Sequence, residues 1–584
     1  MGSLTDDPRL LLRFLIVSCF IFVAMMVVEC KDFSWTVEYI EGNPDGVEGI
    51  VMAINGQFPG PEIRVRAGET VRVNLTNGLS TETEGVVIHW HGIRQLGTPW
   101  ADGAASISQC PIMPGESFVY EFLADKPGTY FYHGHYGMQR TAGLYGMLVV
   151  DVAQGEEEKI KYDGEFNMLL SDWWHDTVQT QAVHLDSKPM KWINEPQSLL
   201  INGRGQYNCS LAAKYETNTT ACTLRGSESY APYIFKVDPN KTYRFRIASA
   251  TSLASLNLAF GNHMVEVVEA DGNYVQPFNT SNIYIYPGET YSILLRTNQD
   301  PTQNYWIRVA VVARDPKTHP ALTFLQYSPN SASVLPSSAP PPAPLWNDFP
   351  AAKNFSKQIL ARDDTTHPPP PATSKPRTLV LLNTQNLIDG RTKWALNNIS
   401  LVLPTTPYLA AIKNNIPDAF DRRTLPDWPE YIGGYDITKP PENTAATTGD
   451  MVYTFGTNET VDVILQNANV LAPVGKSEAH PWHLHGHDFW VLGYGEGKFT
   501  EDDRKGFNVK NPPARFTTVV YPFGWTAVRF VADNPGVWPF HCHIEPHMYM
   551  GMGVVFAEGV DKIGTLPPNG FTCGKMGRTI NGKS

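Results

Sequence analysis

The chain has 584 residues, a formal net charge of −12 at pH 7 and a sequence pI of about 5.7. An acidic chain of this kind argues against a protein that binds nucleic acid or an anionic membrane surface. Its length predicts about three or four domains.

The first 30 residues predict a secretory signal peptide. Arg9 and Arg13 precede an apolar run over residues 14–28, which suits the core of a signal peptide and is short for a membrane span. A signal anchor is the alternative. Because no later stretch of the sequence is long and apolar enough to cross a bilayer, we expect a secreted protein that begins near Lys31 and has no membrane contact after cleavage.

The rest of the sequence predicts an all-β protein of three domains. Helical periodicity is scarce, whereas short runs rich in Val, Ile, Tyr and Thr recur between Gly, Pro and Asn, a pattern typical of β-sandwiches and Greek-key barrels. An internal repeat sets the number of domains at three. Its first signature covers residues 68–77, 241–247 and 459–467. Its second signature follows as Gly115-Glu-Ser-Phe, Gly288-Glu-Thr-Tyr and Gly524-Trp-Thr-Ala.

A proline-rich segment separates the second and third copies of the repeat. Residues 336–344 and 367–371 are rich in proline, which favours extended polyproline geometry and predicts a linker. We therefore place the domains at residues 31–158, 159–373 (linker included) and 374–584, after a signal peptide of residues 1–30.

Four pairs of histidines are separated by a single residue. On a strand, residues i and i+2 face the same side, so each pair offers two imidazoles to one side of a sheet. One such pair alone is most often a surface or hydrogen-bonded pair, but half of the 16 histidines fall into these four. Eight imidazoles are too many for one metal and fit a cluster of three coppers. The pairs are His89 and His91, His133 and His135, His483 and His485, and His541 and His543.

The outer copies of the repeat carry two of these pairs each, and the middle copy carries none. We therefore expect the cluster at an interface between the first and third domains, with the second domain as spacer and substrate wall. Five other histidines have no paired histidine nearby in the sequence and are expected to be structural. They are His175, His184, His263, His319 and His367. His487 is expected to have a packing or hydrogen-bonding role.

Cys542 lies between His541 and His543, so on a strand its side chain faces the opposite side. One cysteine, two histidines and a distant methionine are the ligands of a blue-copper electron-transfer site, and His480, His547 and Met552 complete this set. The count is then ten histidines, one cysteine and one methionine for four coppers. The motif predicts that an electron enters at the copper on Cys542 and leaves through the two flanking histidines.

The remaining cysteines and the glycosylation sequons agree with secretion. Of the seven cysteines, Cys19 and Cys30 lie in or at the edge of the signal peptide, and Cys542 is a candidate ligand. The other four form an even set, as expected of disulfides in an oxidising compartment. They are Cys110, Cys209, Cys222 and Cys573. Cys209 with Cys222 closes a short loop, which leaves Cys110 with Cys573, although sequence alone does not prove this pairing. Sequons of the Asn-x-Ser/Thr type indicate a glycoprotein, and Asn208 is disfavoured by its middle cysteine. They are Asn74, Asn208, Asn218, Asn240, Asn279, Asn354, Asn398 and Asn458.

Four motifs resemble those of the multicopper oxidases over the whole mature chain. They are His89-Trp-His-Gly, His133-Gly-His, His480-Pro-Trp-His-Leu-His-Gly-His and His541-Cys-His-Ile-Glu-Pro-His-Met-Tyr-Met-Gly-Met552. Within this family the chain most resembles the ascorbate oxidases of plants, through residues 100–110 and 486–495. The resemblance implies three cupredoxin-like domains and an extracellular or cell-wall (apoplast) enzyme. Such an enzyme couples one-electron oxidation of L-ascorbate to the four-electron reduction of dioxygen to water, with four coppers.

The resemblance also implies roles for individual residues. His89 and His483 would hold the type 2 copper, and His480, Cys542, His547 and Met552 the type 1 copper. The type 3 pair would be held by His91, His133, His135, His485, His541 and His543.

Two further pairs of residues take roles from the resemblance. Trp192 and Trp394 would line the reductant pocket beside an exposed edge of His547, whereas the residues alone would predict aromatic core. Asp102 and Glu545 match acids that pass protons to the oxygen cluster, and could equally hydrogen-bond the histidine ligands.

One departure from the family pattern concerns a disulfide between the first two domains. Tyr230 occupies one expected cysteine position, and no cysteine lies between Lys31 and Cys110. We therefore hypothesise that these domains are held together noncovalently.

Three alternatives to an ascorbate oxidase remain. They are a laccase that oxidises phenols, a copper-free cell-wall protein of the same fold, and a copper store. A methionine ligand favours a lower potential than a leucine there would give, which suits ascorbate. A copper-free relative would lack much of the ligand set, and a store would not need a cysteine between two cluster histidines. The sequence leaves a homodimer open.

Overall fold

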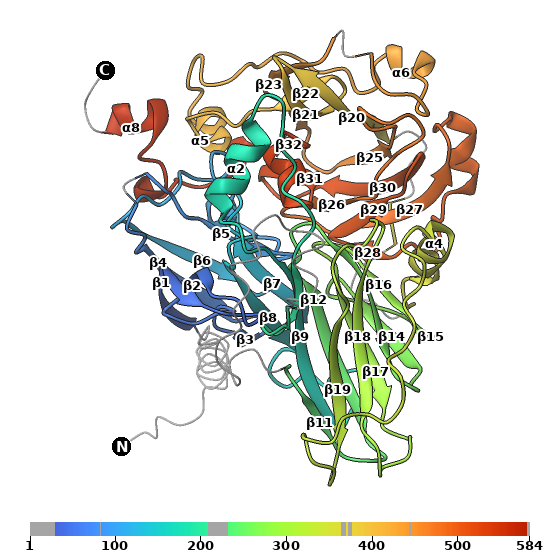
Figure 1. The fold of residues 1–584 in the computed structure, drawn as a ribbon. Helices are drawn as coiled ribbons and strands as arrows, with labels where there is room; N and C mark the ends of the chain where they lie inside the picture. The colour runs from blue at the N-terminus through green and yellow to red at the C-terminus, as the bar shows by residue number, and fades with distance from the viewer. Residues whose placement is uncertain are drawn as a thin grey trace, which may run out of the picture.

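The computed structural model describes residues 30–81, 83–207, 232–363, 369–371, 376–442 and 445–580. Strands are the predominant regular structure of these residues, helices are few and short, and the strands make six sheets (Figure 1). The all-β fold expected from the sequence is confirmed. Several features named above lie outside the described residues: the signal peptide up to residue 29, Cys209, Cys222, Asn208, Asn218, Tyr230 and His367.

The sheets come in pairs, one pair for each copy of the repeat. In the first domain, drawn in blue in Figure 1, the sheets have the orders β2-β1-β4-β6 and β3-β8-β7-β5. Their strands are β1 (Cys30–Gly42), β2 (Gly49–Ile54), β3 (Ile63–Arg66), β4 (Thr70–Asn77), β5 (Ile88–His91), β6 (Ser117–Leu123), β7 (Gly128–Gly134) and β8 (Tyr145–Asp151).

The second domain has the sheet orders β10-β9-β12-β17-β14-β15 and β11-β19-β18-β13-β16. Its strands are β9 (Gly164–Trp173), β10 (Ser198–Ile201), β11 (Phe235–Val237), β12 (Thr242–Ser249), β13 (Ser255–Phe260), β14 (Val265–Ala270), β15 (Asn273–Thr280), β16 (Ile283–Ile285), β17 (Thr290–Arg296), β18 (Tyr305–Val312) and β19 (Ala321–Tyr327).

The third domain has the sheet orders β23-β22-β21-β20-β25-β30-β27-β28 and β24-β32-β31-β26-β29. Its strands are β20 (Arg377–Ile388), β21 (Arg391–Leu396), β22 (Ile399–Leu401), β23 (Thr447–Gly449), β24 (Val452–Phe455), β25 (Glu459–Gln466), β26 (His480–Leu484), β27 (Phe489–Glu496), β28 (Ala514–Arg515), β29 (Thr517–Val520), β30 (Gly524–Ala532), β31 (Gly536–Cys542) and β32 (Gly553–Glu558).

The sequence repeat corresponds to one strand position in each domain. The first signature forms β4, β12 and β25, and each of these strands lies between a parallel and an antiparallel neighbour. The parallel neighbours are β1, β9 and β20, and the antiparallel neighbours are β6, β17 and β30, which follow the second signature.

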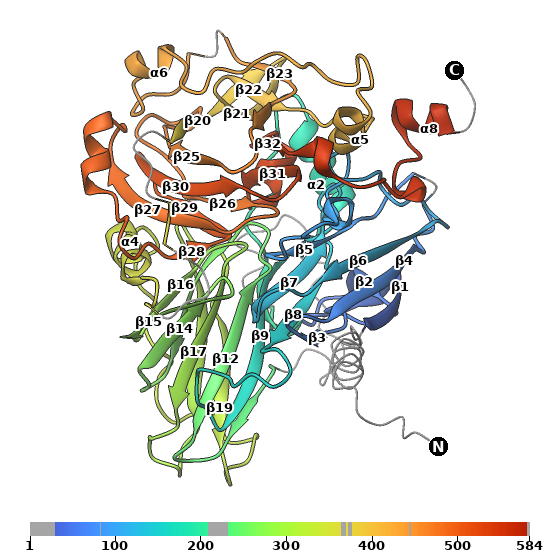
Figure 2. The same ribbon diagram turned by 180° about the vertical axis from the view of Figure 1, so that it is seen from behind.

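Burial along the strands distinguishes the outer surface from the domain interface. β6 alternates between exposed and buried residues, because only one of its faces meets the core. β7 and β31, by contrast, are buried along their whole length. β5 and β7 of the first domain and β26 and β31 of the third carry the paired histidines, and both views show the second domain below this junction (Figures 1 and 2).

The helices are short and lie between strands. Helix α4 (Phe349–Gln358) lies between the two proline-rich runs of residues 336–344 and 367–371. Asp348 caps this helix by accepting a hydrogen bond from the Ala351 N–H at 3.1 Å, and Phe355 is buried in the core of the second domain. The other α-helices are α2 (Val178–Asp186), α5 (Tyr408–Lys413), α6 (Tyr431–Gly434), α7 (Glu545–Tyr549) and α8 (Gly574–Ile580). The 3-10 helices are η1 (Pro99–Ala101), η4 (Glu501–Gly506), η5 (Val560–Lys562) and η6 (Pro568–Gly570).

A disulfide joins Cys110 of the first domain to Cys573 near the end of the described chain. The sequence predicted this disulfide as the pair that remains if Cys209 bonds to Cys222. None of the helices in the described part of the chain is long and apolar enough to span a membrane.

Asp45 ties the first domain to the second. Its buried carboxylate accepts hydrogen bonds from His175 Nε2 at 2.9 Å and from the Ser198 hydroxyl at 2.6 Å. The backbone N–H of Gly205 and that of Tyr207 donate to the carbonyls of residues 44 and 45, each at 2.9 Å. These polar contacts join the first two domains noncovalently.

Replacing Asp45 by asparagine is expected to lower the stability of the protein by about 1–3 kcal/mol, because charge-assisted hydrogen bonds across this interface are lost. The calorimetric unfolding midpoint measures the effect. Asp32→Asn is the control, since the Asp32 side chain is 64% exposed and its ion pair with Arg72 is worth little. An Asp45→Asn variant that unfolds at the wild-type temperature would contradict the role of this contact.

Candidate metal centre

The four histidine pairs lie on two antiparallel strand pairs that belong to different domains. β5 pairs with β7 so that His89 is opposite His133, and β26 pairs with β31 so that His483 is opposite His541. The second histidine of three pairs follows directly after its strand, as His135, His485 and His543. The period-two pattern of each strand therefore turns the rings toward the same interface.

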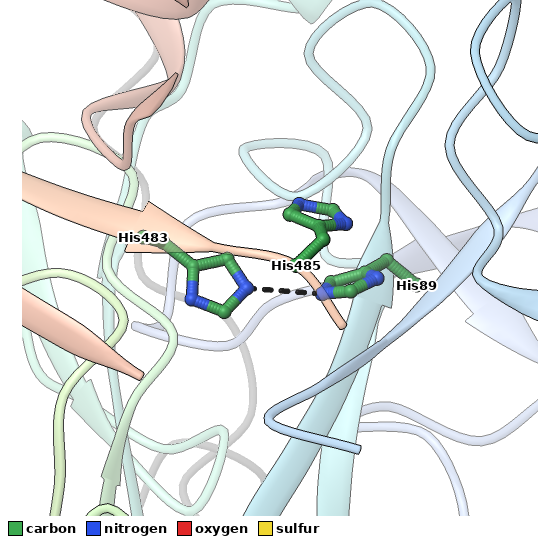
Figure 3. A group of neighbouring side chains, drawn as sticks. All are labelled: His89, His483 and His485. Atoms are coloured by element: carbon green, nitrogen blue, oxygen red, sulfur yellow. Dashed lines mark hydrogen bonds between the residues drawn. The ribbon is translucent and has the colours of Figure 1, made fainter. Parts of the chain in front are cut away.

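The rings converge closely across this interface. The Nε2 atoms of His89 and His483 are 3.2 Å apart, and Figure 3 shows these two rings facing each other with His485 beside them. The Nε2 atom of His541 lies 3.1 Å from that of His485 and 3.4 Å from that of His135. Three groups of three ring nitrogens could each hold a metal: His89, His483 and His485; His89, His91 and His133; and His135, His485 and His541. His543 is not in these groups, but its Nε2 lies 3.3 Å from Nε2 of His133.

Hydrogen bonds to the other ring nitrogen set the orientation of most of these histidines. Asp102 is central: its backbone carbonyl lies 2.8 Å from His89 Nδ1 and its carboxylate 2.9 Å from His485 Nδ1. A proton on Nδ1 leaves the lone pair of Nε2 free for a metal. Backbone carbonyls of Gly134, Phe516 and Cys542 play the same part for His133, His483 and His541.

His91 is oriented the other way. Its Nε2 lies 2.8 Å from the carbonyl oxygen of Gly288 in the second domain, and among the described residues its buried Nδ1 has no hydrogen-bond partner. The free lone pair of His91 is therefore on Nδ1. The second domain, expected as a spacer and substrate wall, thus also orients a ring of the cluster.

Burial keeps the rings of the cluster uncharged. It lowers the pKa of His91, His133, His135, His483, His485 and His543 well below the usual value, and that of His541 to about 3. Neutral imidazoles are the form that ligates metal ions. The donor set thus fits copper or another metal that prefers imidazole nitrogen.

Cys542 forms a second, smaller centre on the opposite face of β31. Its Sγ lies 3.7 Å from Nδ1 of His480 and 3.7 Å from Nδ1 of His547, and the two nitrogens are 3.2 Å apart. A metal between them at ligand distances of about 2.0–2.3 Å would fit this triangle. Buried Met552 adjoins it, since its N–H donates to the His547 carbonyl and its carbonyl accepts from the Cys542 N–H.

Burial raises the pKa of the Cys542 thiol, so the free side chain is a neutral thiol. A bound cation reverses this preference, because it stabilises the thiolate directly. The smaller centre thus combines one sulfur with two imidazole nitrogens in a buried site, which is the donor set of blue-copper proteins.

The environment of His547 differs from the expectation. We expected an exposed edge of this ring, and this is wrong: His547 is 1% exposed. The ring centroid of Trp394 lies 4.9 Å from that of His547, and that of Trp192 lies 6.4 Å away. Trp394 is also fully buried, and only Trp192 is partly exposed.

Two charged residues near His547 were not identified from the sequence. Glu478 Oε2 lies 3.4 Å from His547 Nε2, and Arg314 pairs with Glu478 at 3.6 Å and with Glu195 at 2.9 Å. The Arg314 guanidinium lies 5.6 Å from the ring centroid of Trp192. No sequence signal connects these residues, because they come from separate domains.

Arg140 was also missed. This buried side chain donates to the backbone carbonyl of His543 at 2.5 Å, and its Nη1 lies 2.6 Å from His543 Nδ1. Glu545, expected as an acid near the cluster, accepts from the Arg140 N–H at 3.1 Å and from the Thr141 N–H at 2.8 Å.

A cavity of about 420 Å³ adjoins the histidine cluster. Glu545 and Arg140 line it together with cluster residues, and the exposed side chains of Val402 and Leu403 lie at its rim. Its size is sufficient for small ligands and ordered water. The cluster residues in its wall are His133, His135 and His541.

The remaining histidines that the structure describes have other surroundings. His487 Nδ1 lies 3.2 Å from the backbone carbonyl oxygen of His485, in agreement with a hydrogen-bonding role, and its Nε2 lies 2.8 Å from a carboxylate oxygen of Glu558. His263 contacts the Tyr327 hydroxyl at 2.6 Å. None of the candidate metal groups in the described part of the chain includes them.

Comparisons with known proteins identify the family. Family models described as multicopper oxidase match residues 36–155, 164–330 and 417–562. The chain is 60% identical to the L-ascorbate oxidase of Nicotiana tabacum over 558 residues, which cover 95% of either chain. It is 59% identical to the L-ascorbate oxidase of Cucumis sativus, with 100% of this chain and 99% of the relative covered.

More distant relatives include laccases. Laccase-11 of Arabidopsis thaliana is 32% identical, with 89% of this chain and 91% of the laccase covered. Among solved structures, the laccase from Botrytis aclada has a TM-score of 0.75 at 25% identity, with 94% of this chain and 91% of that chain covered. Fet3p, a multicopper oxidase that functions in iron import, has a TM-score of 0.69 at 26% identity, with 93% and 94% covered.

Proposed function

The chain belongs to the multicopper oxidase family, and from this premise we propose that it is a secreted L-ascorbate oxidase. It couples the one-electron oxidation of L-ascorbate to the four-electron reduction of dioxygen to water. The near full-length identity of 59–60% to L-ascorbate oxidases supports this substrate, whereas laccase-11 is 32% identical. The single observation that carries the mechanism is the placement of Cys542 in one donor group while its sequence neighbours face another.

We propose four coppers, in agreement with the family and with the donor groups. The type 1 copper would be held by His480, Cys542, His547 and Met552, and the type 2 copper by His89 and His483. The type 3 pair would be held by His91, His133, His135, His485, His541 and His543. Bound copper would supply one-electron redox chemistry that joins single-electron donors to a four-electron acceptor.

The protein connects the two centres through its own backbone. Cys542 belongs to the smaller centre, and the adjoining residues His541 and His543 belong to the larger one. One peptide bond on each side of Cys542 therefore joins the two centres. This is the shortest covalent connection that alternation along a strand allows.

On the reductant side, Trp192 and Arg314 offer a flat face and a positive charge near His547. Ascorbate is a flat anion at neutral pH, so a partly exposed ring with a neighbouring guanidinium suits it. Trp394 supports the His480 and His547 rings from within the core, with a centroid 4.8 Å from that of His480.

On the dioxygen side, Asp102 and Glu545 are the acids that would hold protons. Asp102 is buried and contacts the rings of His89 and His485. Glu545 lines the cavity beside the cluster. Glu545 could thus exchange protons with the cavity, and Asp102 with the histidine rings that it contacts, without direct exposure to bulk solvent.

Secretion and glycosylation belong to the same proposal. Of the sequons in the described residues, five have exposed asparagines, while Asn398 is half-buried. Exposure is required for a glycan. The exposed asparagines are Asn74, Asn240, Asn279, Asn354 and Asn458.

The function is tested with purified copper-loaded protein. We expect strong absorption at about 600 nm from the Cys542–copper bond, and oxygen uptake with ascorbate at higher catalytic efficiency than with any phenol of a panel. A colourless protein with a full complement of copper would overturn the assignment of Cys542. Much higher efficiency with a phenol would make the protein a laccase.

Replacing Trp192 by alanine is expected to raise KM for ascorbate by about two- to tenfold, because one stacking face is lost, with a smaller effect on kcat. Steady-state oxygen uptake measures both constants. Trp428→Ala is the control, since it removes a partly exposed ring that packs on Phe499. Equal KM values in wild type and Trp192→Ala would exclude Trp192 from the reductant site.

A further inference from the structure

A buried carboxylate in the second domain holds a loop that the proposed chemistry does not use. Asp172, near the end of β9, accepts hydrogen bonds from the N–H groups of Ser252 at 2.7 Å and of Leu253 and Ala254 at 2.8 Å each. Burial raises its pKa to about 6, and the three N–H donors oppose this rise. The side chain is therefore mostly ionised at neutral pH and fixes the backbone of the loop between β12 and β13.

This loop contacts the segment that carries His547. The carbonyl of Ser252 accepts a hydrogen bond from the N–H of Glu545 at 2.8 Å, and Glu545 is the first residue of α7. His547 lies two residues further along this helix. The position of the loop thus determines where α7 begins relative to β31.

The same loop enters the apolar core around the smaller metal centre. Leu253 is fully buried in the cluster that contains Cys542, Met552 and Trp394. A side chain from the second domain therefore completes the packing around a site whose ligands all come from the third domain. Dense packing of this kind restricts the movement of the ligands.

Asp172 also interacts electrostatically with the buried Arg140 and the partly exposed Arg314. Arg140 donates to the carbonyl of His543, and Arg314 lies beside Trp192 near His547. Loss of the Asp172 charge would thus leave two positive groups less balanced around α7.

We propose that Asp172 is a positioning residue for the type 1 copper site, acting through the loop 252–254 on α7 and on the packing around Cys542. The proposal rests on the copper site proposed above. It assigns to the second domain, which supplies no ligand to this site, control over the geometry of His547 and hence over electron entry.

The test is Asp172→Asn in the full-length copper-loaded protein. An asparagine of the same size keeps one acceptor oxygen but turns an amide N–H toward backbone N–H groups. We expect the copper content to be retained and the absorption at about 600 nm to shift and weaken. We also expect anaerobic bleaching of this band by ascorbate to slow by about tenfold.

Val267→Ala is the matched control. It removes buried apolar volume from β14 in the same domain and lowers stability without touching the loop, so its absorption band and bleaching rate should match the wild type. Should Asp172→Asn not fold, Asp172→Glu carries the same test, because its longer side chain displaces the loop while keeping the charge.

The outcomes separate this inference from the function on which it rests. A wild-type protein without the band would overturn the proposed function and this inference with it. If the wild type has the band and the Asp172 variant shows it with the same position, intensity and bleaching rate, the inference alone is overturned. The inference is also overturned if Val267→Ala changes the band and its bleaching rate as much as the Asp172 variant does.

Discussion

Replacing Cys542 by serine is expected to abolish the absorption at about 600 nm and to lower turnover with L-ascorbate by more than about 100-fold. Loss of a residue that only hydrogen-bonds a metal ligand lowers activity by up to about 100-fold. We expect a larger loss here, because Cys542 is proposed as a ligand itself. A hydroxyl group does not replace the thiolate, because its oxygen stays protonated and does not supply the soft donor that copper prefers. The proposed path to His541 and His543 is then lost at its first atom.

The change should be confined to the smaller centre. We expect copper analysis to show about one copper fewer per chain, while the histidine cluster keeps its metals, because none of its candidate groups includes Cys542. Ala557→Ser is the control, since it buries a hydroxyl group at an equally inaccessible position on the neighbouring strand β32. A Cys542→Ser variant that stays blue, or that oxidises ascorbate at the wild-type rate, would exclude the proposed role of the thiolate.

The ligand candidates could be predicted from the sequence because the relevant pattern is local. On a strand the alternation of faces follows from backbone geometry, so Cys542 had to face away from its two neighbours. The structure places Cys542 with His480 and His547, and His541 with His135 and His485. The central strands β4, β12 and β25 could be predicted for a similar reason, since each copy of the repeat has the same local pattern.

The residues that the sequence did not reveal act through contacts between domains. The carbonyl of Gly288 orients His91, and the guanidinium of Arg140 contacts His543, but neither belongs to a motif with a period. Such contacts depend on how three domains pack, and local sequence carries no record of it. The carbonyl of Gly288 has the further difficulty that any residue type can supply a backbone acceptor.

One wrong expectation has the same origin. The edge of His547 was expected to be exposed, yet the ring is 1% exposed and packs near Trp394 and Trp192, which come from two domains. Helix α4 was not identified from the sequence for a similar reason. It lies between the two proline-rich runs, and the core of the second domain buries its Phe355.

The covered His547 ring has a consequence for electron entry. A reductant would not need to touch this ring, because the partly exposed Trp192 has its ring centroid 6.4 Å from that of His547. Direct contact at Trp192 would suffice, since electrons cross a few ångströms of packed protein. On the proposed function, the low exposure of His547 would keep water from the smaller centre while Trp192 and Arg314 bind the reductant.

Replacing Asp102 by asparagine is expected to slow dioxygen reduction without slowing electron entry. The Asp102 carboxylate accepts from His485 Nδ1 at 2.9 Å and lies 3.2 Å from His89 Nδ1. The amide keeps the size of the side chain and one oxygen that accepts hydrogen bonds. It loses the negative charge and the ability to take up and release a proton. We expect kcat with ascorbate to fall by about 10- to 100-fold, while anaerobic bleaching of the blue band stays at the wild-type rate.

The comparison of the two rates distinguishes a role at the histidine cluster from general damage. Asp125→Asn is the matched control, because it alters another largely buried carboxylate of the first domain, one that pairs with Arg94 and contacts no candidate ligand. Its turnover should stay close to wild type. If the Asp102 variant bleached as slowly as it turned over, its defect would lie at electron entry, and Asp102 would have no specific part in dioxygen reduction. Slow turnover with rapid bleaching instead places the block after the electron has left Cys542, at the rings that Asp102 holds.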